Sequence, residues 1–527
     1  MKKIYAINIV ILMVISTFFI ATTTANQLTT KNTMPLIYSG DDLDPLVDIE
    51  VTVDIKAIRS LEKFDTQVHR FEKIDWLSDP DFYVKVIVND QIEESNVWRN
   101  TKYVYEPNFS PTFNVPDDEE FVNITIQLWD WNIGLDRICD ISNIYDDGYR
   151  DSFDVELRYS LKSGHWFGDD FAAITSWEYD KSGYGRLNGC DDGSIYQRNR
   201  DCELWFDITQ TDYDGDGIPY WTEVNIFGTD PEFDNTGEDN DEDGIPIEWE
   251  YKWGHNLFYN WHEDEYYHEW IYSPLTYEDH ASLDPDNDGL DNYEEYLTSQ
   301  WGSDPFRTDL FVELDEMSVS PDGFKSRLPE GSKELLRTAY NRQNVVYHLD
   351  DGHMGGYKPG FESGHDIIPF YEMIDHETLR NEIYLDYFLH GDENNWRKGV
   401  FHYGVVVYQA DYNGYVFISD SYQISAHGME DKVLPNTQKK RDIVYASAYM
   451  HECGHTLGIF NGNTPGCDDQ ESKFPWKLNW WKWRPYRSVM NYGYMYNIVD
   501  YSDGSRGRND FDDWDRLDFT FFQYGWG

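Results

Sequence analysis

The sequence predicts a multidomain protein made of an all-β sandwich, a spacer of acidic loops and a C-terminal α+β domain. Three observations predict it. Residues 46–210 alternate apolar and polar side chains, residues 211–305 repeat one acidic pattern, and residues 306–527 mix helix-like and strand-like segments. The length of 527 residues agrees with this division, because one domain typically takes about 150 residues.

The chain is strongly acidic and rich in aromatic residues. It carries 98 Asp and Glu against 42 Lys and Arg, a formal net charge of -56, and 17 % of its residues are aromatic. So many apolar and aromatic residues exclude a disordered chain. The negative charge repels nucleic acid and anionic lipid unless cations intervene. Bound divalent ions would relieve the repulsion, and a high-salt habitat is the alternative explanation.

Residues 1–25 have the layout of a signal peptide. Two lysines precede an apolar run from Ile4 to Ile20, and small and polar residues follow as far as Ala25. We expect cleavage near Ala25 and a secreted or extracellular protein, with attachment to the cell surface as a further option. An uncleaved membrane anchor is the alternative, and no later stretch of the sequence is expected to span a membrane.

Five cysteines in an exported chain allow at most two internal disulfides. Cys190 and Cys202 bracket a short polar loop and are predicted to form one bridge. Cys453 and Cys467 are a second candidate pair, although Cys453 also fits a buried helix stripe. Cys139 is then expected to be a lone thiol in the core.

The β-rich region, residues 46–210, contains short strand patterns such as "DFYVKVIV" and "FVNITIQLWDW", separated by Asn, Asp, Pro and Gly. Short strands at this spacing predict an antiparallel β-sandwich. The stretches "DWLSDPDFYVKV" and "VPDDEEFVNITIQLWDWNIGLDRICDIS" resemble C2 domains, sandwiches that bind calcium in loops at one end and often contact membranes there. The resemblance implies calcium ligands in two loops. The first loop would supply Asp75 and either Asp79 or Asp81, and the second would supply Asp130, Asn132 and Asp136. The alternative is that these are ordinary loop acids.

Three segments of the spacer, residues 211–305, share one acidic pattern: "DYDGDGIPYWTE", "DNDEDGIPIEWE" and "DPDNDGLDNYEE". Each has Asp at positions 1, 3 and 5, Gly at 6, an apolar residue at 7 and Glu at 12. Short carboxylates around a tight turn, closed by a longer Glu, supply the oxygen ligands that calcium prefers. The candidate calcium ligands are Asp212, Asp214, Asp216 and Glu223, then Asp239, Asp241, Asp243 and Glu250, then Asp284, Asp286, Asp288 and Glu295.

The repeated segments, with "FGTDP" and "WGSDP" after the first and the third, resemble the calcium repeats of thrombospondin type 3 and dockerin-like modules. These EF-hand-like repeats keep only the calcium loop and the helix that follows it. The resemblance implies a spacer that calcium stiffens and whose structure depends on the ion.

The last region, residues 306–527, is predicted to contain strands at "TDLFVELDEM", "NVVYHL" and "GVFHYGVVVYQAD", an edge strand at "GYVFISDS", and helices at "GSKELLRTAYNR", "ETLRNEIYLDYFL" and "DDWDRLDFTFF". A further helix is predicted at "RDIVYASAYMHECGHTLG". It would bury one apolar stripe, because apolar residues recur at intervals of three and four at Ile443, Ala446, Met450, Cys453 and Leu457.

His451 and His455 lie four residues apart on this predicted helix, so both imidazoles can reach one zinc ion. Glu452 lies beside them. A glutamate in this place can take a proton from a metal-activated water and pass it to the leaving amine of a peptide. The alternative is that two histidines and a glutamate share a helix by chance.

Two further features accompany this pattern. Gly458 stands three residues after His455, where a left-handed residue can end the helix, and "SVMNYGY" follows downstream. Together they resemble the metzincin clan of zinc metallopeptidases. The resemblance implies an α+β catalytic domain. In it His451 and His455 would be zinc ligands, Glu452 the general base and Gly458 the turn. Met490 would form a hydrophobic floor beneath the metal, and Tyr492 would be a further ligand or an oxyanion donor.

Asn461 departs from the metzincin pattern, because the clan has His or Asp at the place of the third zinc ligand. A neutral amide is a poor zinc ligand. We therefore expect a carboxylate from the following loop, with Asp468 favoured over Asn461 itself. A disulfide between Cys453 and Cys467 would hold Asp468 close to the helix.

The sequence therefore predicts a secreted, calcium-stabilised zinc endopeptidase that acts on proteins or peptides. The C2-like sandwich would dock it on a membrane or cell surface through calcium, and nucleic acid is excluded as a partner by charge. The alternative is a calcium-dependent adhesion or surface-binding protein whose peptidase-like domain is inactive because Asn461 leaves zinc unheld. Retention of Glu452 favours an active enzyme, because binding alone does not need that carboxylate.

Overall fold

The computed structural model describes residues 48–62, 74, 78–142, 153–170, 185–190, 200–260, 265–354 and 363–524. The predicted signal peptide and Asp75 lie outside the described residues. Among the described helices, none combines the length and the hydrophobicity that crossing a membrane requires.

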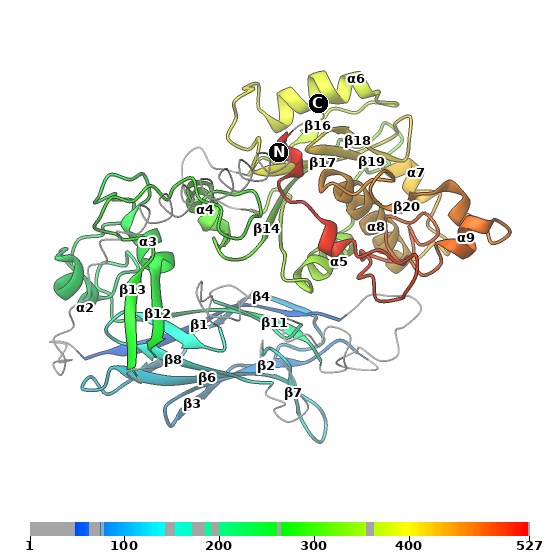
Figure 1. Ribbon diagram of the computed structural model, residues 1–527. Coiled ribbons are helices and arrows are strands. Elements are labelled where there is room, and N and C mark those ends of the chain that lie inside the picture. The colour runs from blue at the N-terminus through cyan, green and yellow to red at the C-terminus, as the bar shows by residue number, and fades with distance from the viewer. Residues whose placement is uncertain are drawn as a thin grey trace, which may run out of the picture.

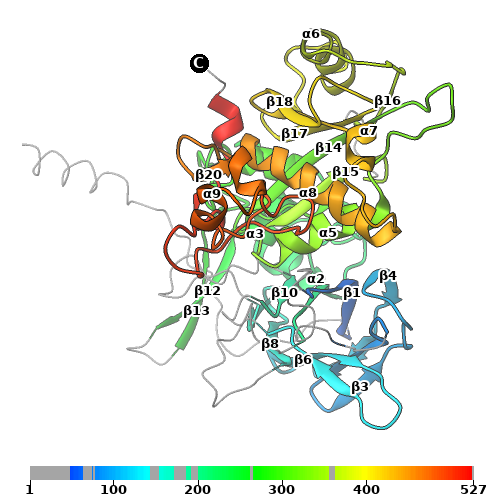
Figure 2. The ribbon, with the colours of Figure 1, turned by 90° about the vertical axis from the view of Figure 1, so that its right-hand side faces the viewer.

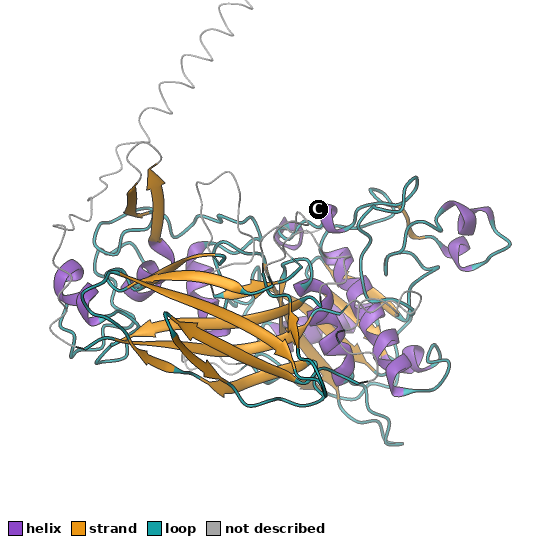
Figure 3. Cartoon of the chain, turned by 90° about the horizontal axis from the view of Figure 1, so that it is seen from below, coloured by secondary structure: helices purple, strands orange, loops and turns teal. Residues whose placement is uncertain are grey.

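The N-terminal part is a sandwich of two antiparallel sheets, which Figure 1 shows from the side as stacked layers of strands and Figure 3 shows from below. One sheet contains β10 (Arg186–Asn188), β11 (Cys202–Gln210), β1 (Glu50–Ser60), β4 (Tyr103–Phe109) and β5 (Thr112–Asn114). The other contains β3 (Gln91–Glu94), β2 (Phe82–Val88), β6 (Phe121–Asp130), β7 (Arg137–Cys139), β8 (Val155–Ser160) and β9 (His165–Gly168). The predicted β-sandwich is thereby confirmed.

The alternating pattern in the sequence is what builds this sandwich. Along β6, Val122, Ile124, Ile126 and Leu128 are buried, while the residues between them are half-buried or exposed. Because side chains alternate between the two faces of a strand, this register turns one apolar face toward the opposite sheet. The apolar side chains of β1, β2, β6, β8 and β11 form one continuous core.

The predicted disulfide between Cys190 and Cys202 is wrong, since all five cysteines have free thiols. Cys190 instead contacts the carboxylate of Asp201, with its Sγ 3.6 Å from Oδ2. Cys202 lies within β11 and points into the core beside Cys139, and burial raises the pKa of the Cys202 thiol well above its usual value. Because successive side chains of a strand point to opposite faces, the direction of the Cys202 side chain is set by the strand rather than by the loop before it.

The spacer consists of the acidic loops, each followed by a helical turn, and a hairpin that the sequence did not predict. Its elements are α2 (Tyr220–Thr222), η1 (Glu223–Phe227), α3 (Ile247–Gly254), β12 (His255–Asn260), β13 (Glu265–Trp270), α4 (Asn292–Thr298) and η2 (Ser299–Trp301). The helix α4 is preceded by a capping box, in which Asp291 and Glu294 accept hydrogen bonds from each other's backbone amides.

The C-terminal part is built around a mixed sheet. Its strands, in order across the sheet, are β15 (Val346–Asp350), β14 (Asp309–Met317), β17 (Phe401–Val407), β19 (Ser421–Ser425) and β18 (Gly414–Ile418), with β16 (Ile367–Ile368) also paired to β14. All pairs are parallel except that of β18 with β19. The predicted edge strand is therefore present as β18, and it runs against its neighbour.

Helices cover both faces of this sheet. The face that carries Leu310, Val312 and Leu314 packs against α5 (Glu330–Asn341) and α8 (Gln438–Thr456), which Figure 2 shows running along it. The opposite face packs against the π-helix η3 (Leu379–Phe388), which continues the short helix α6 (His376–Thr378). A short helix, α7 (Ala426–Glu430), leads from β19 toward α8.

The chain after α8 has little regular structure. It contains β20 (Pro465–Asp468), η4 (Gln470–Lys473), α9 (Leu478–Lys482), η5 (Trp514–Arg516) and η6 (Phe521–Tyr524). The predicted closing helix at "DDWDRLDFTFF" is wrong, since only the two last short turns form there. Its backbone bonds outward instead: the amide of Asp518 donates to the carbonyl of Leu457 at the end of α8, 3.0 Å away.

Candidate metal centre and acidic loops

The helix α8 positions His451, Glu452 and His455. It begins after Thr437, whose hydroxyl accepts a hydrogen bond from the backbone amide of Lys440 at 3.2 Å. The apolar stripe predicted from the sequence is buried against the sheet. The helix ends at Thr456, and Gly458 two residues later has a φ of +85° that glycine adopts at little cost.

Backbone carbonyls fix the tautomer of both histidines. Nδ1 of His451 lies 2.9 Å from the carbonyl oxygen of Val489, and Nδ1 of His455 lies 2.7 Å from that of Ile459. A carbonyl oxygen can only accept a hydrogen bond, so both rings carry a proton on Nδ1. In the neutral rings Nε2 is therefore a lone-pair acceptor.

The carboxylate of Asp468 faces both of these nitrogens. Its Oδ1 lies 3.2 Å from Nε2 of His451 and its Oδ2 lies 3.5 Å from Nε2 of His455. Two imidazole nitrogens and one carboxylate thus meet at a single point, and such a set is held together either by a proton on an imidazole or by a metal ion between the three groups. Asn461, the other residue that the sequence suggested, is exposed in the turn after α8.

Two neighbouring carbonyls hold the parts of this cluster together. The amide of Asp468 donates to the carbonyl of Met490 at 3.1 Å, and the carbonyl of Val489 accepts the hydrogen bond from Nδ1 of His451. Asp468 itself has a φ of +57°. The predicted disulfide between Cys453 and Cys467 is wrong, because both thiols are free and buried. Asp468 is positioned by its hydrogen bond to the backbone carbonyl of Met490 instead.

The cluster is electrostatically coupled. Burial alone would raise the pKa of Asp468, but its contacts with His451 and His455 hold that pKa well below the usual value. Burial would lower the pKa of His455, but Asp468 and Glu452 raise it to about 8. Burial raises the pKa of Glu452, and the two histidines offset part of the rise. Glu452 is thus the carboxyl of the cluster that takes up a proton most readily.

Two glycines make room for the cluster, and the sequence did not indicate either role. A Cβ on Gly414, the first residue of β18, would lie 2.3 Å from Oε1 of Glu452. A Cβ on Gly454 would lie 2.8 Å from Sδ of Met490. Without a Cβ on Gly414, Glu452 can lie against the edge strand β18. Without a Cβ on Gly454, Met490 can lie against α8 at the position between His451 and His455. No local sequence signal marks Gly414, because the contact joins distant segments.

Tyr492 lies against the cluster. Its ring stacks on the ring of His451, with centroids 5.5 Å apart, and the ammonium group of Lys473 lies 4.2 Å from the centre of the tyrosine ring. Burial and the nearby Asp468 raise the pKa of the Tyr492 hydroxyl. The hydroxyl therefore stays protonated and can donate a hydrogen bond.

The three acidic loops share one set of hydrogen bonds. In each loop the amide of the glycine at position 6 donates to the carboxylate at position 1, at 3.1, 2.9 and 3.1 Å. The amide at position 7 donates to the carboxylate at position 5, at 2.8, 3.0 and 2.8 Å. All three glycines have positive φ, and they are Gly217, Gly244 and Gly289.

The loops turn carboxylates toward one another without enough donors to satisfy them. Buried side-chain oxygens with no hydrogen-bond partner occur in all three, at Asp214 and Glu223, at Asp241 and Glu250, and at Asp284, Asp286 and Glu295. Burial, together with the neighbouring acids of its loop, raises the pKa of Glu250 to about 10. The residues present therefore fit a divalent cation bound by oxygen ligands.

A histidine that the repeat pattern did not reveal lies against the second loop. Nε2 of His280 lies 3.1 Å from Oδ2 of Asp243 and 3.2 Å from Oε1 of Glu250. The side-chain amide of Asn292 lies 3.2 Å from Nδ1 of this ring and also donates to the His280 carbonyl. Nδ1 is thus the acceptor, and Nε2 carries the proton that the two carboxylates share.

The third loop is joined to the C-terminal sheet. The backbone amide of Asp309, the first residue of β14, donates to Oδ2 of Asp288 at 2.6 Å. The carboxylate of Asp309 in turn bonds Nε2 of His348 at 2.5 Å and the amide of Asp304 at 2.9 Å. The third loop therefore lies one hydrogen bond away from the strand β14.

The acids predicted as C2 calcium ligands are engaged with each other. Oδ1 of Asp130 accepts the amide of Asp81, and its Oδ2 accepts the side-chain amide of Asn132, at 2.9 and 2.8 Å. Oδ2 of Asp136 accepts the hydroxyl of Tyr83 at 3.0 Å. Asp79 is half-buried, and its backbone amide donates to Oδ1 of Asn100 at 3.3 Å. This arrangement favours ordinary loop acids over a preformed calcium site.

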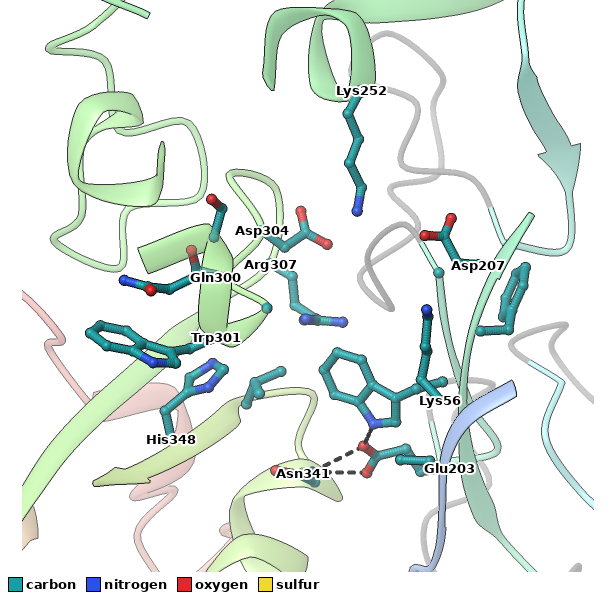
Figure 4. A pocket seen from close by; sticks show the side chains of 18 of the residues that line it. Lys56, Glu203, Asp207, Lys252, Gln300, Trp301, Asp304, Arg307, Asn341 and His348 are labelled. Carbon is teal, nitrogen blue, oxygen red and sulfur yellow. Dashed lines mark hydrogen bonds between the residues drawn. The ribbon is translucent and has the colours of Figure 1, made fainter. Parts of the chain in front are cut away.

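A cavity of about 780 Å³ lies where the sandwich, the spacer and the C-terminal part meet (Figure 4). Lys56, Lys252 and Arg307 lie around it, and Asn341 at the end of α5 donates to Glu203 at 2.9 Å. None of the histidines or carboxylates around Asp468 lines this cavity. The cluster is the stronger candidate site, because it gathers three side chains of the types that hold metal ions.

No known protein family matches the sequence, and no curated protein does. Among solved structures, human GIVD cytosolic phospholipase A2 is 14 % identical, with a TM-score of 0.16, over 31 % of this chain and 16 % of that one. A structure of two C2 domains of Extended-Synaptotagmin 2 is 11 % identical, with a TM-score of 0.18, over 32 % and 42 %. A C2 domain of plant Extended Synaptotagmin 1 is 14 % identical, with a TM-score of 0.16, over 31 % and 97 %. Likenesses this low assign no activity to the chain, which spans about a sixth of the phospholipase.

Proposed function

We propose that the protein is a zinc-dependent endopeptidase whose spacer binds calcium. The observation that carries the proposal is the meeting of two imidazole lone pairs and the Asp468 carboxylate beside a buried glutamate, Glu452. Two histidines and one carboxylate are a donor set that suits zinc and leaves a fourth position open for a catalytic ligand. A zinc ion bound there would lower the pKa of a water molecule and polarise the carbonyl of a peptide.

The surrounding side chains have the properties that peptide hydrolysis needs. Burial raises the pKa of Glu452, which fits it to take a proton from the attacking water and to give it to the leaving amine. The Tyr492 hydroxyl remains protonated and can donate a hydrogen bond to the oxygen that gains negative charge. His451 and His455 hold their orientation through the carbonyls of Val489 and Ile459.

The edge strand β18 supports a peptide as the substrate. Among the described strands it is the last of the sheet, so one side of its backbone has no neighbouring strand. An extended peptide can add to such an edge through main-chain hydrogen bonds. Because Gly414 at the start of β18 contacts Glu452, a peptide bound along this edge would pass the cluster.

Calcium would neutralise the acidic loops of the spacer. The unpaired carboxylate oxygens there and the link from Asp288 to Asp309 support a structural role for the ion, next to the sheet that carries the cluster. Secretion completes the proposal and rests on the sequence pattern alone, whereas the internal hydrogen bonds of Asp130 and Asp136 do not support calcium-mediated contact of the sandwich with a membrane.

One experiment tests the enzyme directly. Hydrolysis of casein would be measured for the wild type and for Glu452→Ala, each loaded with zinc and each again after zinc chelation, with calcium present throughout. We expect activity only for the zinc-loaded wild type, because Glu452→Ala keeps the ligands but loses the base. Equal inactivity of the zinc-loaded wild type and variant would contradict the proposal. It would favour the alternative of a surface-binding protein with an inactive peptidase-like domain.

A further inference from the structure

A positively charged segment follows the candidate metal centre in the sequence. Between Glu471 and Asp500 the chain contains no acidic residue, although the whole protein carries a net charge of -56. This stretch instead contains five basic residues and four tryptophans, which are Lys473, Lys477, Lys482, Arg484 and Arg487, and Trp476, Trp480, Trp481 and Trp483. We call residues 473–487 the basic aromatic segment.

The apolar side chains of the basic aromatic segment are presented to solvent. The exposed fractions of Trp476, Leu478 and Trp481 are 75 %, 85 % and 59 %, and Phe474 is exposed as well. Figures 1 and 3 show the chain around α9 projecting from the body of the molecule at the right-hand edge. Large apolar side chains gathered at one projecting place mark an interaction surface.

The basic aromatic segment is held in this position by hydrogen bonds. Oδ2 of Asp469 accepts the side-chain amide of Asn479 at 2.7 Å and the indole N–H of Trp483 at 3.0 Å. The indole N–H of Trp481 donates to the carbonyl of Pro475 at 3.1 Å. Trp483 is buried and fixes the base of the segment, so the structure holds the side chains at its tip in their exposed positions.

A cavity of about 350 Å³ opens at the base of the basic aromatic segment. Arg484 and Arg487 line it together with Ser472, Trp480 and Asn491. The guanidinium of Arg484 lies 5.2 Å from the ring centre of Trp480. Ser472 and Asn491 already donate to backbone carbonyls, so the two guanidinium groups are the donors there that suit a phosphate.

We propose that the basic aromatic segment docks the protein on an anionic phospholipid surface, with the cavity at its base receiving a headgroup phosphate. Exposed tryptophans fit the interface between headgroups and acyl chains, and lysines that flank them can extend to the headgroups. Charge decides the occupant, because an anionic bilayer repels the remaining acidic surface and leaves this segment as the favourable point of approach. The proposal does not depend on peptidase activity.

Vesicle sedimentation tests this surface. The full chain would be mixed with vesicles of phosphatidylglycerol and phosphatidylcholine, or of phosphatidylcholine alone, with calcium and again with a calcium chelator. We expect binding to the anionic vesicles in both conditions and at least about tenfold weaker binding to the neutral ones. Binding should weaken as salt rises.

Three variants separate this surface from others. Trp476→Ala/Leu478→Ala/Trp481→Ala and Arg484→Gln/Arg487→Gln should each weaken binding by about tenfold or more. The matched control, Ile133→Ala/Leu135→Ala, removes two similarly exposed apolar side chains from a sandwich loop and should leave binding unchanged. Circular dichroism and thermal unfolding would show that each variant folds.

Several outcomes would overturn the proposal. One is loss of binding in the sandwich-loop variant alone, which would assign the membrane contact to that loop. Another is equal binding to neutral and anionic vesicles. A third is concentration-dependent dimerisation that the tryptophan variant abolishes while vesicles do not bind, since the segment would then recognise the acidic surface of a second copy.

Discussion

The backbone amide of Asp468 donates a hydrogen bond of 3.1 Å to the carbonyl oxygen of Met490. The preceding carbonyl, that of Val489, accepts Nδ1–H of His451. One turn of the chain therefore orients a histidine and a carboxylate toward the same point. Since that turn contacts α8 through Gly454, its packing and the geometry of the cluster depend on each other.

Replacing Asp468 should remove zinc from the protein. In Asp468→Ala two neutral imidazoles would remain, and we expect zinc affinity to fall by at least about 100-fold. Zinc would be counted by mass spectrometry after dialysis. Asn461→Ala is the control and should keep one zinc ion per chain. Unchanged zinc content in Asp468→Ala would exclude this carboxylate as a ligand.

Gly414→Ala should impair catalysis without loss of metal. The new methyl group would lie 2.3 Å from Oε1 of Glu452 and would displace that carboxylate. We expect kcat to fall by about 100-fold, because misplacement of a catalytic group by about 1 Å has effects of that size. Gly462→Ala is a matched control, since a Cβ there meets no atom within 4 Å. Equal kcat values for the two variants would refute the contact.

Removal of calcium should destabilise the protein, and most of all through the third loop. Glu295→Gln removes the closing carboxylate of the loop that bonds to β14, whereas Glu223→Gln changes a loop without that link. We expect Glu295→Gln to lower Tm in saturating calcium by about 5–10 °C, and Glu223→Gln to lower it less. The measurement is differential scanning calorimetry. If both variants had the same Tm as the wild type, in calcium and again in a chelator, this result would contradict a structural calcium ion.

The calcium-free protein should lose stability as pH rises. Burial and neighbouring acids raise the pKa of Asp216 and Asp241 to about 6 and that of Glu223 to about 7. With raised values, the folded state binds more protons than the unfolded state between about pH 4 and pH 7, so stability falls across this window. Bound calcium replaces those protons and should remove the trend. Urea unfolding at pH 5, 6 and 7 in a chelator would check it, and a rise in stability would contradict it.

All five cysteines should react as free thiols. Alkylation of the unfolded, unreduced protein should add five groups per chain, as counted by mass spectrometry. The result should be the same after prior reduction. A mass that rises only after reduction would show a disulfide, and peptide mapping would then identify its two cysteines.

The repeating parts of the protein could be predicted from the sequence. Alternation along β6 and the acidic pattern of the spacer each reflect local periodicity, which neighbouring residues determine. The helix with His451 and His455 was predictable for the same reason. The closing helix was not, because Asp518 bonds to Leu457 rather than to its own turn.

The sequence by itself determined the sandwich, the three acidic loops and the histidine helix, since each depends on the order of residues within a short stretch. The tertiary structure decided which residue faces the two histidines, that Gly414 contacts Glu452, and that Asp309 joins the third loop to the sheet. It also decided that Cys202 faces Cys139 rather than Cys190. These contacts join residues far apart in the chain, and packing of the whole fold selects them.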